Sequence, residues 1–320
     1  MTISRRTAMA AGALAAAGAA TLARAQTNDG AVSSASMSGN PADRSFTQRF
    51  VETTDGVNLH VRAYGKGPDV VLIHGWPLSH VMWEYQVAPL VEAGNRVIMY
   101  DRRGFGMSEQ PYDGYDYDTM ADDLKAVMDA TNAQDAALVG FSMGGGEVAR
   151  YMSRHEGANV RSAMLVSAVT PFMLQTDDHQ SGLPAKAFED IKAGLRKDRP
   201  GFLAGFFKDF VGQGTEGGGV SEETLEWIRT VAMMGMPHGT IECVTAFGTT
   251  DFRPDMAAFD VPTLLIHGTA DKTVPIDISA RDAAPMIEGA ELKEYEGAPH
   301  ALTTTHADRF NADAIAFLKD

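Results

Sequence analysis

The sequence predicts an α/β protein with a mostly parallel, doubly wound sheet and a helical insertion that caps the sheet. Short apolar segments recur along the chain and alternate with segments of helical periodicity, which is typical of strand–helix–strand units. The alternation is interrupted once, at about 171–247, where helical segments and loops follow one another. With 320 residues, 44% of them hydrophobic, the chain has enough apolar side chains for one large core.

The N-terminal residues have the features of an export signal. Arg5 and Arg6 precede a run of Ala, Gly and Leu that ends in Ala23-Arg24-Ala25, an A-x-A cleavage pattern. We expect residues 1–25 to be a twin-arginine signal, cut before Gln26, and the mature protein to be periplasmic or secreted. A transmembrane anchor is the alternative, but the run is short and rich in Ala and Gly, so no stable membrane anchoring is expected after cleavage.

Composition excludes several classes of function. Without residues 1–25, the chain keeps 24 basic and 42 acidic residues, a net charge of −18, so binding to nucleic acid is not expected. The single cysteine, Cys243, excludes an internal disulfide and a Cys-based zinc site, and we interpret it as a small buried hydrophobe.

Residues 26–45 are mostly Ser, Ala, Gly and Asn, which predicts a flexible leader before a folded domain at 46–320.

The folded domain is expected to begin with a hairpin, because alternating segments at 49–52 and 57–63 flank an Asp-Gly pair. Further strands, most of them apolar throughout as in parallel sheets, are expected at 70–73, 97–100, 137–139, 163–166, 263–266 and 292–295. Helical periodicity is clear at 120–130 and 144–152. In the insertion, four side chains share one helical face, which predicts packing of the cap against the sheet: Phe202, Phe206, Phe207 and Phe210.

A serine lies in a tight-turn motif between an expected strand and an expected helix. The segment Gly140-Phe141-Ser142-Met143-Gly144 has the pattern G-x-S-x-G in the context that a nucleophile elbow requires. Glycines flank such a serine because the turn leaves no room for neighbouring side chains. We therefore predict that Ser142 is a nucleophile.

A serine hydroxyl attacks a carbonyl group only with the help of a base and of a carboxylate that orients the base. In this architecture the acid and then the histidine follow the serine along the chain. Asp271 follows the strand at 263–266, and His300 follows the strand at 292–295, so three strand ends would supply the catalytic set. Other candidates are less well placed or are interpreted as surface or structural residues: Asp260, Asp277, His155, His179, His238, His267 and His306.

Two backbone N–H groups are expected to stabilise the oxyanion of the tetrahedral intermediate, and each is worth about 3–4 kcal/mol in sites of this kind. One is the N–H of Met143, at the start of the helix after the serine. The other is the N–H of Trp76, in the loop after the strand at 70–73. The side chains of Trp76, Phe141 and Met143 are expected to line the acyl pocket, and core packing is the alternative for Trp76.

Two further patterns suggest other chemistry and are interpreted differently. The glycines at 212–217 match G-x-G-x-x-G, but no strand precedes them, so they predict a loop of the cap. Five acids suggest a metal site, but a solvated helix start with acids near its positive end explains them better: Asp113, Asp116, Asp118, Asp122 and Asp123. No metal site and no cofactor site is predicted.

From about Phe46 to Leu318 the sequence resembles the bacterial non-haem haloperoxidases, the chloroperoxidase-type esterases and perhydrolases of the α/β-hydrolase superfamily. The matching segments are His74-Gly75-Trp76-Pro77, Tyr100-Asp101-Arg102-Arg103-Gly104-Phe105-Gly106, Tyr115-Asp116-Tyr117-Asp118, Gly140 to Gly145, Thr250-Asp251-Phe252-Arg253 and Ala298-Pro299-His300-Ala301. The resemblance implies activity on small carboxylic esters without a cofactor, through the triad of Ser142, Asp271 and His300. It also implies perhydrolysis, in which a carboxylic acid acylates the serine and hydrogen peroxide releases a peracid that oxidises bromide or chloride.

The sequence departs from this pattern at three points. Thr269 stands where many relatives have an additional Asp, the export signal is an addition, and Gly145-Gly146 is expected to loosen the start of the helix after the serine.

A lactonase or a C–C bond hydrolase would use the same triad, and a non-catalytic ligand-binding homologue is the alternative from another class. Epoxide hydrolases and haloalkane dehalogenases are disfavoured because they have Asp at the position of Ser142. The expected partner is a small ester or carboxylic acid, and a homo-oligomer is left open.

Overall fold

The computed structural model describes residues 47–319. The expected signal at 1–25 and the expected leader at 26–45 lie outside the described residues. Within 47–319, no helix has both the length and the apolar character needed to span a bilayer.

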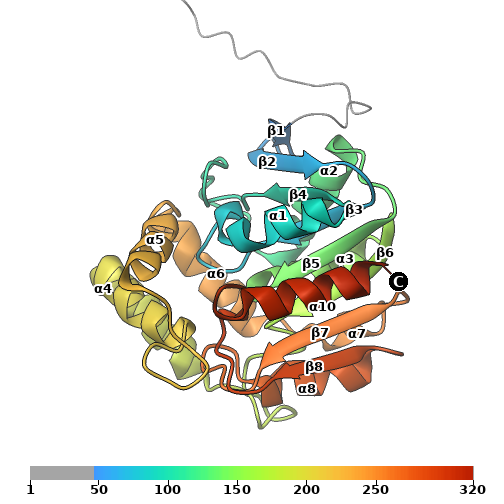
Figure 1. The fold of residues 1–320 in the computed structure, drawn as a ribbon. Helices are drawn as coiled ribbons and strands as arrows, with labels where there is room; N and C mark the ends of the chain where they lie inside the picture. The colour runs from blue at the N-terminus through green and yellow to red at the C-terminus, as the bar shows by residue number, and fades with distance from the viewer. Residues whose placement is uncertain (1–46, 320) are drawn as a thin grey trace, which may run out of the picture. The chain divides into compact units, whose positions relative to one another are not determined.

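An eight-stranded sheet forms the centre of the described domain, in the order β1-β2-β4-β3-β5-β6-β7-β8 (Figure 1). The strands are β1 (Gln48–Glu52), β2 (Asn58–Gly65), β3 (Asp69–Ile73), β4 (Arg96–Tyr100), β5 (Ala136–Phe141), β6 (Val160–Val166), β7 (Thr263–Gly268) and β8 (Glu291–Tyr295). Only β2 runs antiparallel to its neighbours β1 and β4, and every other pair is parallel. The predicted hairpin, strands and doubly wound class are therefore confirmed.

Helices cover both faces of the sheet. The helices α1 (Glu84–Glu92) and α10 (Ala307–Lys319) pack together on the face turned to the viewer in Figure 1, and α2 (Tyr117–Ala130) and α3 (Met143–Arg154) pack together on the other face. Because of this double cover, β3, β4 and β5 are buried along their whole length. This burial accounts for strands that are apolar throughout.

The insertion lies between β6 and β7. It contains α4 (Ala185–Phe210), α5 (Glu222–Met233), α6 (Pro237–Thr249) and α7 (Arg253–Met256), and the first three lie on the side toward which β7 and β8 point (Figure 1). The helix α4 is kinked at Asp198, two residues before Pro200. Of the four phenylalanines on its predicted face, Phe207 and Phe210 are buried and Phe202 and Phe206 are half-buried.

Short elements complete the fold: η1 (His80–Trp83), η2 (Ile276–Ile278), α8 (Ala280–Ala283), η3 (Ala284–Met286) and α9 (Leu302–Thr305). The glycines at 212–217 form turns between α4 and α5, as predicted. Cys243 is fully buried in α6, and burial raises the pKa of its thiol to about 12. The prediction of a small buried side chain at this position is confirmed.

The start of α3 corrects one expectation. The helix begins at Met143 and is regular through Gly145 and Gly146. A Cβ atom at Gly145 would lie 2.4 Å from the Cβ of Ala168, and one at Gly146 would lie 2.6 Å from the ring of Tyr117. The expected loosening was wrong because these glycines let α3 pack close to its neighbours, and that packing holds the helix in place.

Candidate active site

Ser142 occupies the turn between β5 and α3. Its backbone has φ 54° and ψ −118°, a conformation that costs a residue with a side chain about 1–3 kcal/mol. A Cβ atom at Gly140 would lie 2.4 Å from the carbonyl oxygen of Gly144, and one at Gly144 would lie 2.5 Å from that of Ile73. The turn therefore needs both glycines of the motif, as the sequence indicated.

The structure brings together the three residues predicted as a catalytic set. His300 Nε2 lies 2.9 Å from Ser142 Oγ, and His300 Nδ1 lies 2.6 Å from Asp271 Oδ2. All three side chains are buried. Since the Asp271 carboxylate can only accept, Nδ1 of His300 carries the proton and Nε2 is left to accept the serine proton.

The environment of Asp271 keeps its carboxyl group ionised. Burial alone would raise the pKa of Asp271, but His300 and His267 beside it lower the pKa by more, and the net value lies well below the usual range. The other oxygen, Oδ1, accepts the N–H groups of Thr273 at 2.9 Å and Val274 at 2.8 Å. Two backbone N–H groups and Nδ1 of His300 thus hold the carboxylate in position.

His267 was interpreted from the sequence as a structural residue, and its contacts extend that interpretation. It is fully buried, and its Nε2 lies 2.8 Å from the carbonyl oxygen of Val274. The same nitrogen lies 3.2 Å from Oδ2 of Asp271. The sequence did not predict this contact, although the spacing of four residues across a strand end permits it.

The alternative acid Asp277 is exposed and pairs with Arg281 instead.

The two predicted oxyanion donors lie beside the serine. A Cβ atom at Gly75 would lie 3.1 Å from the Cβ of Ser142, so the loop after β3 runs directly against this serine. Met143 is the first residue of α3, and the N–H of such a residue has no acceptor within its helix. Among the backbone hydrogen bonds that the described residues form in turns, loops and helix caps, none is donated by the N–H of Trp76 or of Met143. This is compatible with the predicted role of both groups as oxyanion donors.

The three residues predicted to line the acyl pocket are all buried. The indole Nε1 of Trp76 donates to the carbonyl oxygen of Thr240 in α6, at 2.9 Å, and its ring packs against Phe206 and Phe247 of the cap. Phe141 packs against the ring of His300, with centroids 5.0 Å apart. Met143 has no exposed surface. Trp76 thus connects the loop after β3 to the cap, and the packing expected as its alternative role is present.

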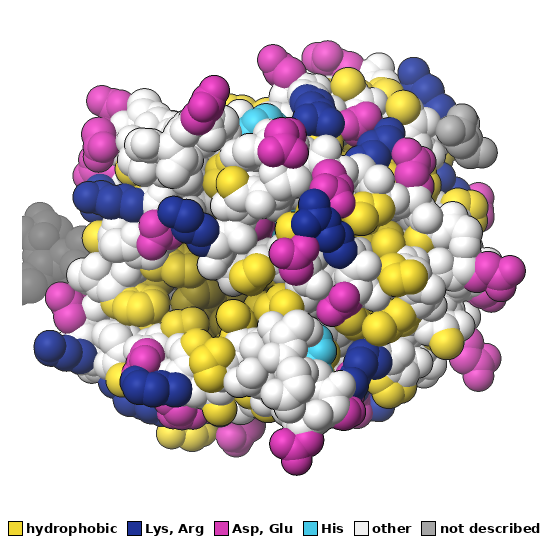
Figure 2. Space-filling view, turned by 90° about the horizontal axis from the view of Figure 1, so that it is seen from below, with side chains coloured by type: hydrophobic (Ala, Val, Ile, Leu, Met, Phe, Trp, Pro, Cys, Tyr) yellow, Lys and Arg dark blue, Asp and Glu magenta, His cyan; other side chains and the backbone are white. Residues whose placement is uncertain are grey.

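One face of the described domain is hollowed, and hydrophobic side chains line the hollow (Figure 2). Lys, Arg, Asp and Glu side chains lie around it. A concave surface with an apolar lining favours ligands with apolar groups.

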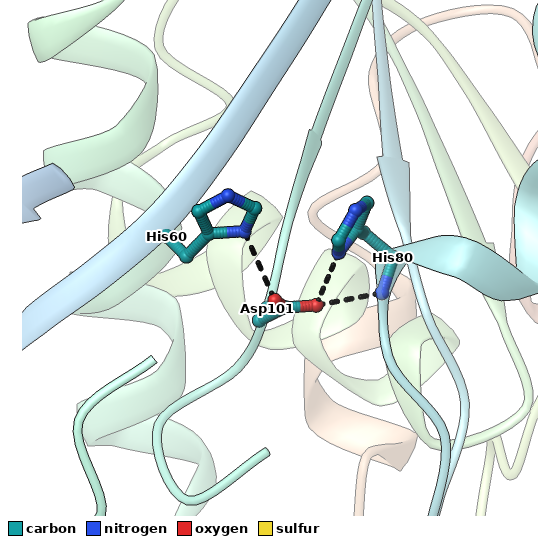
Figure 3. A group of neighbouring side chains, drawn as sticks. All are labelled: His60, His80 and Asp101. Atoms are coloured by element: carbon teal, nitrogen blue, oxygen red, sulfur yellow. Dashed lines mark hydrogen bonds and ion pairs between the residues drawn. The ribbon is translucent and has the colours of Figure 1, made fainter. Parts of the chain in front are cut away.

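Sequence reasoning missed a buried cluster of His60, His80 and Asp101, which lies where β2, the start of η1 and the end of β4 meet (Figure 3). Asp101 Oδ2 accepts from His60 Nδ1 at 3.0 Å and from the N–H of Met107 at 2.9 Å. Oδ1 accepts both Nδ1 and the backbone N–H of His80, at 2.7 and 2.8 Å. Among the described residues, this is the only cluster whose His and acidic side chains lie close enough together to bind one metal ion. The carboxylate of Asp101 already accepts four hydrogen bonds, however, so we interpret the cluster as a structural network.

The acids near the start of α2 also differ in part from expectation. Asp116 caps α2 by accepting the N–H of Thr119, which agrees with acids at a helix start. Asp123, expected to be solvated, is buried and pairs with Arg103, which also pairs with Asp55. The expectation was wrong for Asp123 because the inner face of α2 turns this side chain toward the core.

Known proteins resemble this chain along most of its length. The model of the α/β-hydrolase fold family matches residues 68–307. The chain is 41% identical over 268 residues to the non-heme chloroperoxidase CPO-A1 of Kitasatospora aureofaciens, covering 83% of this chain and 98% of that protein. It is 39% identical over 277 residues to the bifunctional esterase/perhydrolase DCH of Acinetobacter calcoaceticus, covering 84% of this chain and 99% of the relative.

A solved structure agrees with these relatives. The crystal structure of bromoperoxidase from Bacillus anthracis matches with a TM-score of 0.82 and 43% sequence identity, over 85% of this chain and 100% of that chain. The esterase EaEST of Exiguobacterium antarcticum matches with a TM-score of 0.81 and 31% identity, over 85% of this chain and 99% of that chain. Together with the fold, these similarities show that the chain is an enzyme of the α/β-hydrolase superfamily and belongs to its family of non-haem haloperoxidases, esterases and perhydrolases.

Proposed function

We propose that this enzyme hydrolyses small carboxylic esters through an acyl-enzyme on Ser142. The observation that carries the proposal is the continuous hydrogen-bonded series from Ser142 Oγ through His300 to Asp271. As Ser142 attacks the ester carbonyl, His300 takes its proton, and the Asp271 carboxylate stabilises the imidazolium that forms.

The remaining steps use the same groups. The N–H groups of Trp76 and Met143 stabilise the oxyanion, and His300 gives its proton to the departing alcohol. Water then attacks the acyl-enzyme while His300 accepts one of its protons and returns it to Ser142 Oγ. The products are the carboxylic acid and the free enzyme.

We propose perhydrolysis as a second activity of the same site. A carboxylic acid acylates Ser142 with loss of water, and hydrogen peroxide then attacks the acyl carbon in place of water. The bond from the acyl carbon to Ser142 breaks, His300 moves the peroxide proton to the serine oxygen, and a peracid leaves to oxidise halide in solution. The names of two relatives, a chloroperoxidase and an esterase/perhydrolase, support this proposal.

The proposal is tested by hydrolysis of p-nitrophenyl esters from acetate to decanoate. We expect turnover of the short esters, loss of activity in Ser142→Ala, and unchanged activity in Ser153→Ala, which alters a serine of the same helix. A parallel assay with acetate, hydrogen peroxide and bromide should show halogenation that requires both acetate and Ser142. A wild-type protein inert toward every ester would contradict the esterase proposal and direct attention to lactones and C–C substrates.

We also propose that the enzyme acts in the periplasm or outside the cell, on the basis of the twin-arginine segment in the sequence. Replacing both Arg5 and Arg6 by Lys should retain the protein in the cytoplasm, as measured by fractionation. Equal export of the variant and the wild type would contradict the proposal.

A further inference from the structure

Arg102 connects the two elements that carry the proposed oxyanion donors. It is fully buried two residues after β4, and its Nη2 donates to the carbonyl oxygen of His74 at 2.7 Å. Its guanidinium group also pairs with the carboxylate of Glu147 in α3. His74 lies two residues before Trp76, and Glu147 lies four residues, about one helical turn, after Met143. One side chain thus contacts both the loop after β3 and the helix after the serine.

The backbone of Arg102 fixes the ring of His74. The N–H of Arg102 donates to His74 Nε2 at 2.9 Å, so this nitrogen carries no proton. His74 Nδ1 therefore carries the proton and donates to the carbonyl oxygen of Gly75, also at 2.9 Å. Burial and the positive charge of Arg102 lower the pKa of His74 to about 3, so the ring keeps this neutral form at ordinary pH.

The Gly75 carbonyl group and the Trp76 N–H belong to the same peptide unit. Because a peptide unit is planar, a hydrogen bond that fixes the direction of the carbonyl group also fixes the direction of the N–H. The Gly75 oxygen accepts a second bond, from the N–H of Leu78 at 3.0 Å. Hydrogen bonds to a carbonyl oxygen polarise the peptide unit and strengthen its N–H as a donor.

The loop and the helix also touch directly. A Cβ atom at Gly144 would lie 2.9 Å from the carbonyl oxygen of His74, the atom that Arg102 holds. Glu147 is fully buried and accepts a further hydrogen bond from the hydroxyl of Tyr100. A buried ion pair adds little net stability compared with apolar side chains of equal volume, but a guanidinium group fixes the direction of its partners. An oxyanion hole requires N–H groups that are held in a fixed direction.

We propose that Arg102 and His74 are positioning residues of the oxyanion hole: Arg102 holds His74 and α3 together, and His74 orients the peptide unit that presents the Trp76 N–H. This inference rests on the proposed function, because it needs Ser142 to form a tetrahedral adduct.

Arg103 provides a matched control for Arg102. It is the next residue, it is also buried in ion pairs, and its partners Asp55 and Asp123 belong to neither the loop nor α3. Arg102→Lys keeps a charge for Glu147 but loses the planar set of donors, whereas Arg103→Lys makes the same change away from the site. A second pair is His74→Leu, which removes the donor to Gly75, and His74→Asn, whose amide N–H can replace Nδ1.

The experiment measures the adduct of each variant with a short alkyl trifluoromethyl ketone, isotope-labelled at the carbonyl carbon for NMR. The pKa of the hemiketal hydroxyl on Ser142 reports how well the donors stabilise the oxyanion. We expect Arg102→Lys and His74→Leu to raise this pKa by about one unit and to lower kcat about tenfold with KM nearly unchanged. Arg103→Lys should keep the wild-type values, even where it is less stable to heat. His74→Asn should lie closer to the wild type than His74→Leu, because it keeps a donor to Gly75 although it loses the acceptor of the Arg102 N–H.

Equal hemiketal pKa values in Arg102→Lys and Arg103→Lys would overturn the inference and leave Arg102 a structural role only. If Arg102→Lys does not fold, the His74 pair decides, and equal values for His74→Leu and His74→Asn would overturn it. If the wild type itself forms no adduct, the proposed function fails, and the inference fails with it.

Discussion

The ring of Phe210 packs edge-on against the ring of His300, with centroids 5.0 Å apart and an angle of 67° between the planes. Phe210 is the last residue of the cap helix α4, and its carbonyl oxygen accepts the N–H of Ala301 at 3.0 Å. The cap is therefore bonded to the loop that carries the proposed base. Packing changes in this part of the cap should therefore affect the position of His300.

Phe210→Ala tests this connection. Because Phe210 is buried, the change should lower the free energy of unfolding by about 3–5 kcal/mol, and kcat should fall as His300 loses one wall of its site. Phe202→Ala, a half-buried residue of the same helix, should have a smaller effect on stability and none on kcat. Urea unfolding and ester hydrolysis measure both quantities, and equal losses of kcat in the two variants would speak against the connection.

Asp271→Asn should lower kcat by about 10³–10⁴-fold, because an amide cannot stabilise the imidazolium and can favour the wrong tautomer of His300. KM should change little, since Asp271 lies behind the histidine. Asp277→Asn, an exposed position six residues along the chain, is the control and should keep wild-type kinetics. A comparable loss in both variants would contradict the assigned role of Asp271.

His74 should make the protein less stable in mild acid. Burial and Arg102 lower its pKa from 6.5 to about 3 in the folded protein, so below pH 6.5 the unfolded chain binds more protons than the folded one. The free energy of unfolding should therefore fall as the pH drops from about 6.5 toward 3, by up to about 1.4 kcal/mol per pH unit from this group. His74→Asn should give a shallower slope in urea unfolding between about pH 6 and pH 4.5, and an unchanged slope would count against the prediction.

Gly144→Ala and Gly205→Ala should change stability in opposite directions. A Cβ atom at Gly144 would lie 2.5 Å from a backbone oxygen, so overpacking should cost about 1–3 kcal/mol and kcat should fall. A Cβ atom at Gly205, in α4, meets no atom within 4 Å, so the alanine should stabilise the helix by about 0.4–1 kcal/mol. Thermal and urea unfolding of the two variants test the signs directly.

The strands and the order of Ser142, Asp271 and His300 could be predicted because each depends on local patterns. Apolar segments of three or four residues, a glycine-flanked serine and residues just after strand ends are all visible along the chain. Their meeting point follows from the rule that parallel strands end at one edge of the sheet.

The polar networks could not be predicted in the same way. Asp101 joins His60 and His80, and Arg102 joins His74 and Glu147, across separations of 21–45 residues. Single polar residues at such separations leave no period in the sequence, and their burial depends on the folded sheet. The tight packing at Gly145 and Gly146 was missed for another reason. In a sequence, a glycine that permits the close approach of two elements looks the same as a glycine that permits flexibility.

The most direct test of the account is mass spectrometry of the protein quenched during turnover of a short p-nitrophenyl ester. We predict an acyl group on the peptide that contains Ser142, which accumulates with the ester and disappears when the ester is exhausted. Asp271→Asn should form the same adduct more slowly, and Ser142→Ala should form none. Turnover of the ester with no acyl group on Ser142, or with the acyl group on another residue, would contradict the central claim that this serine is the nucleophile.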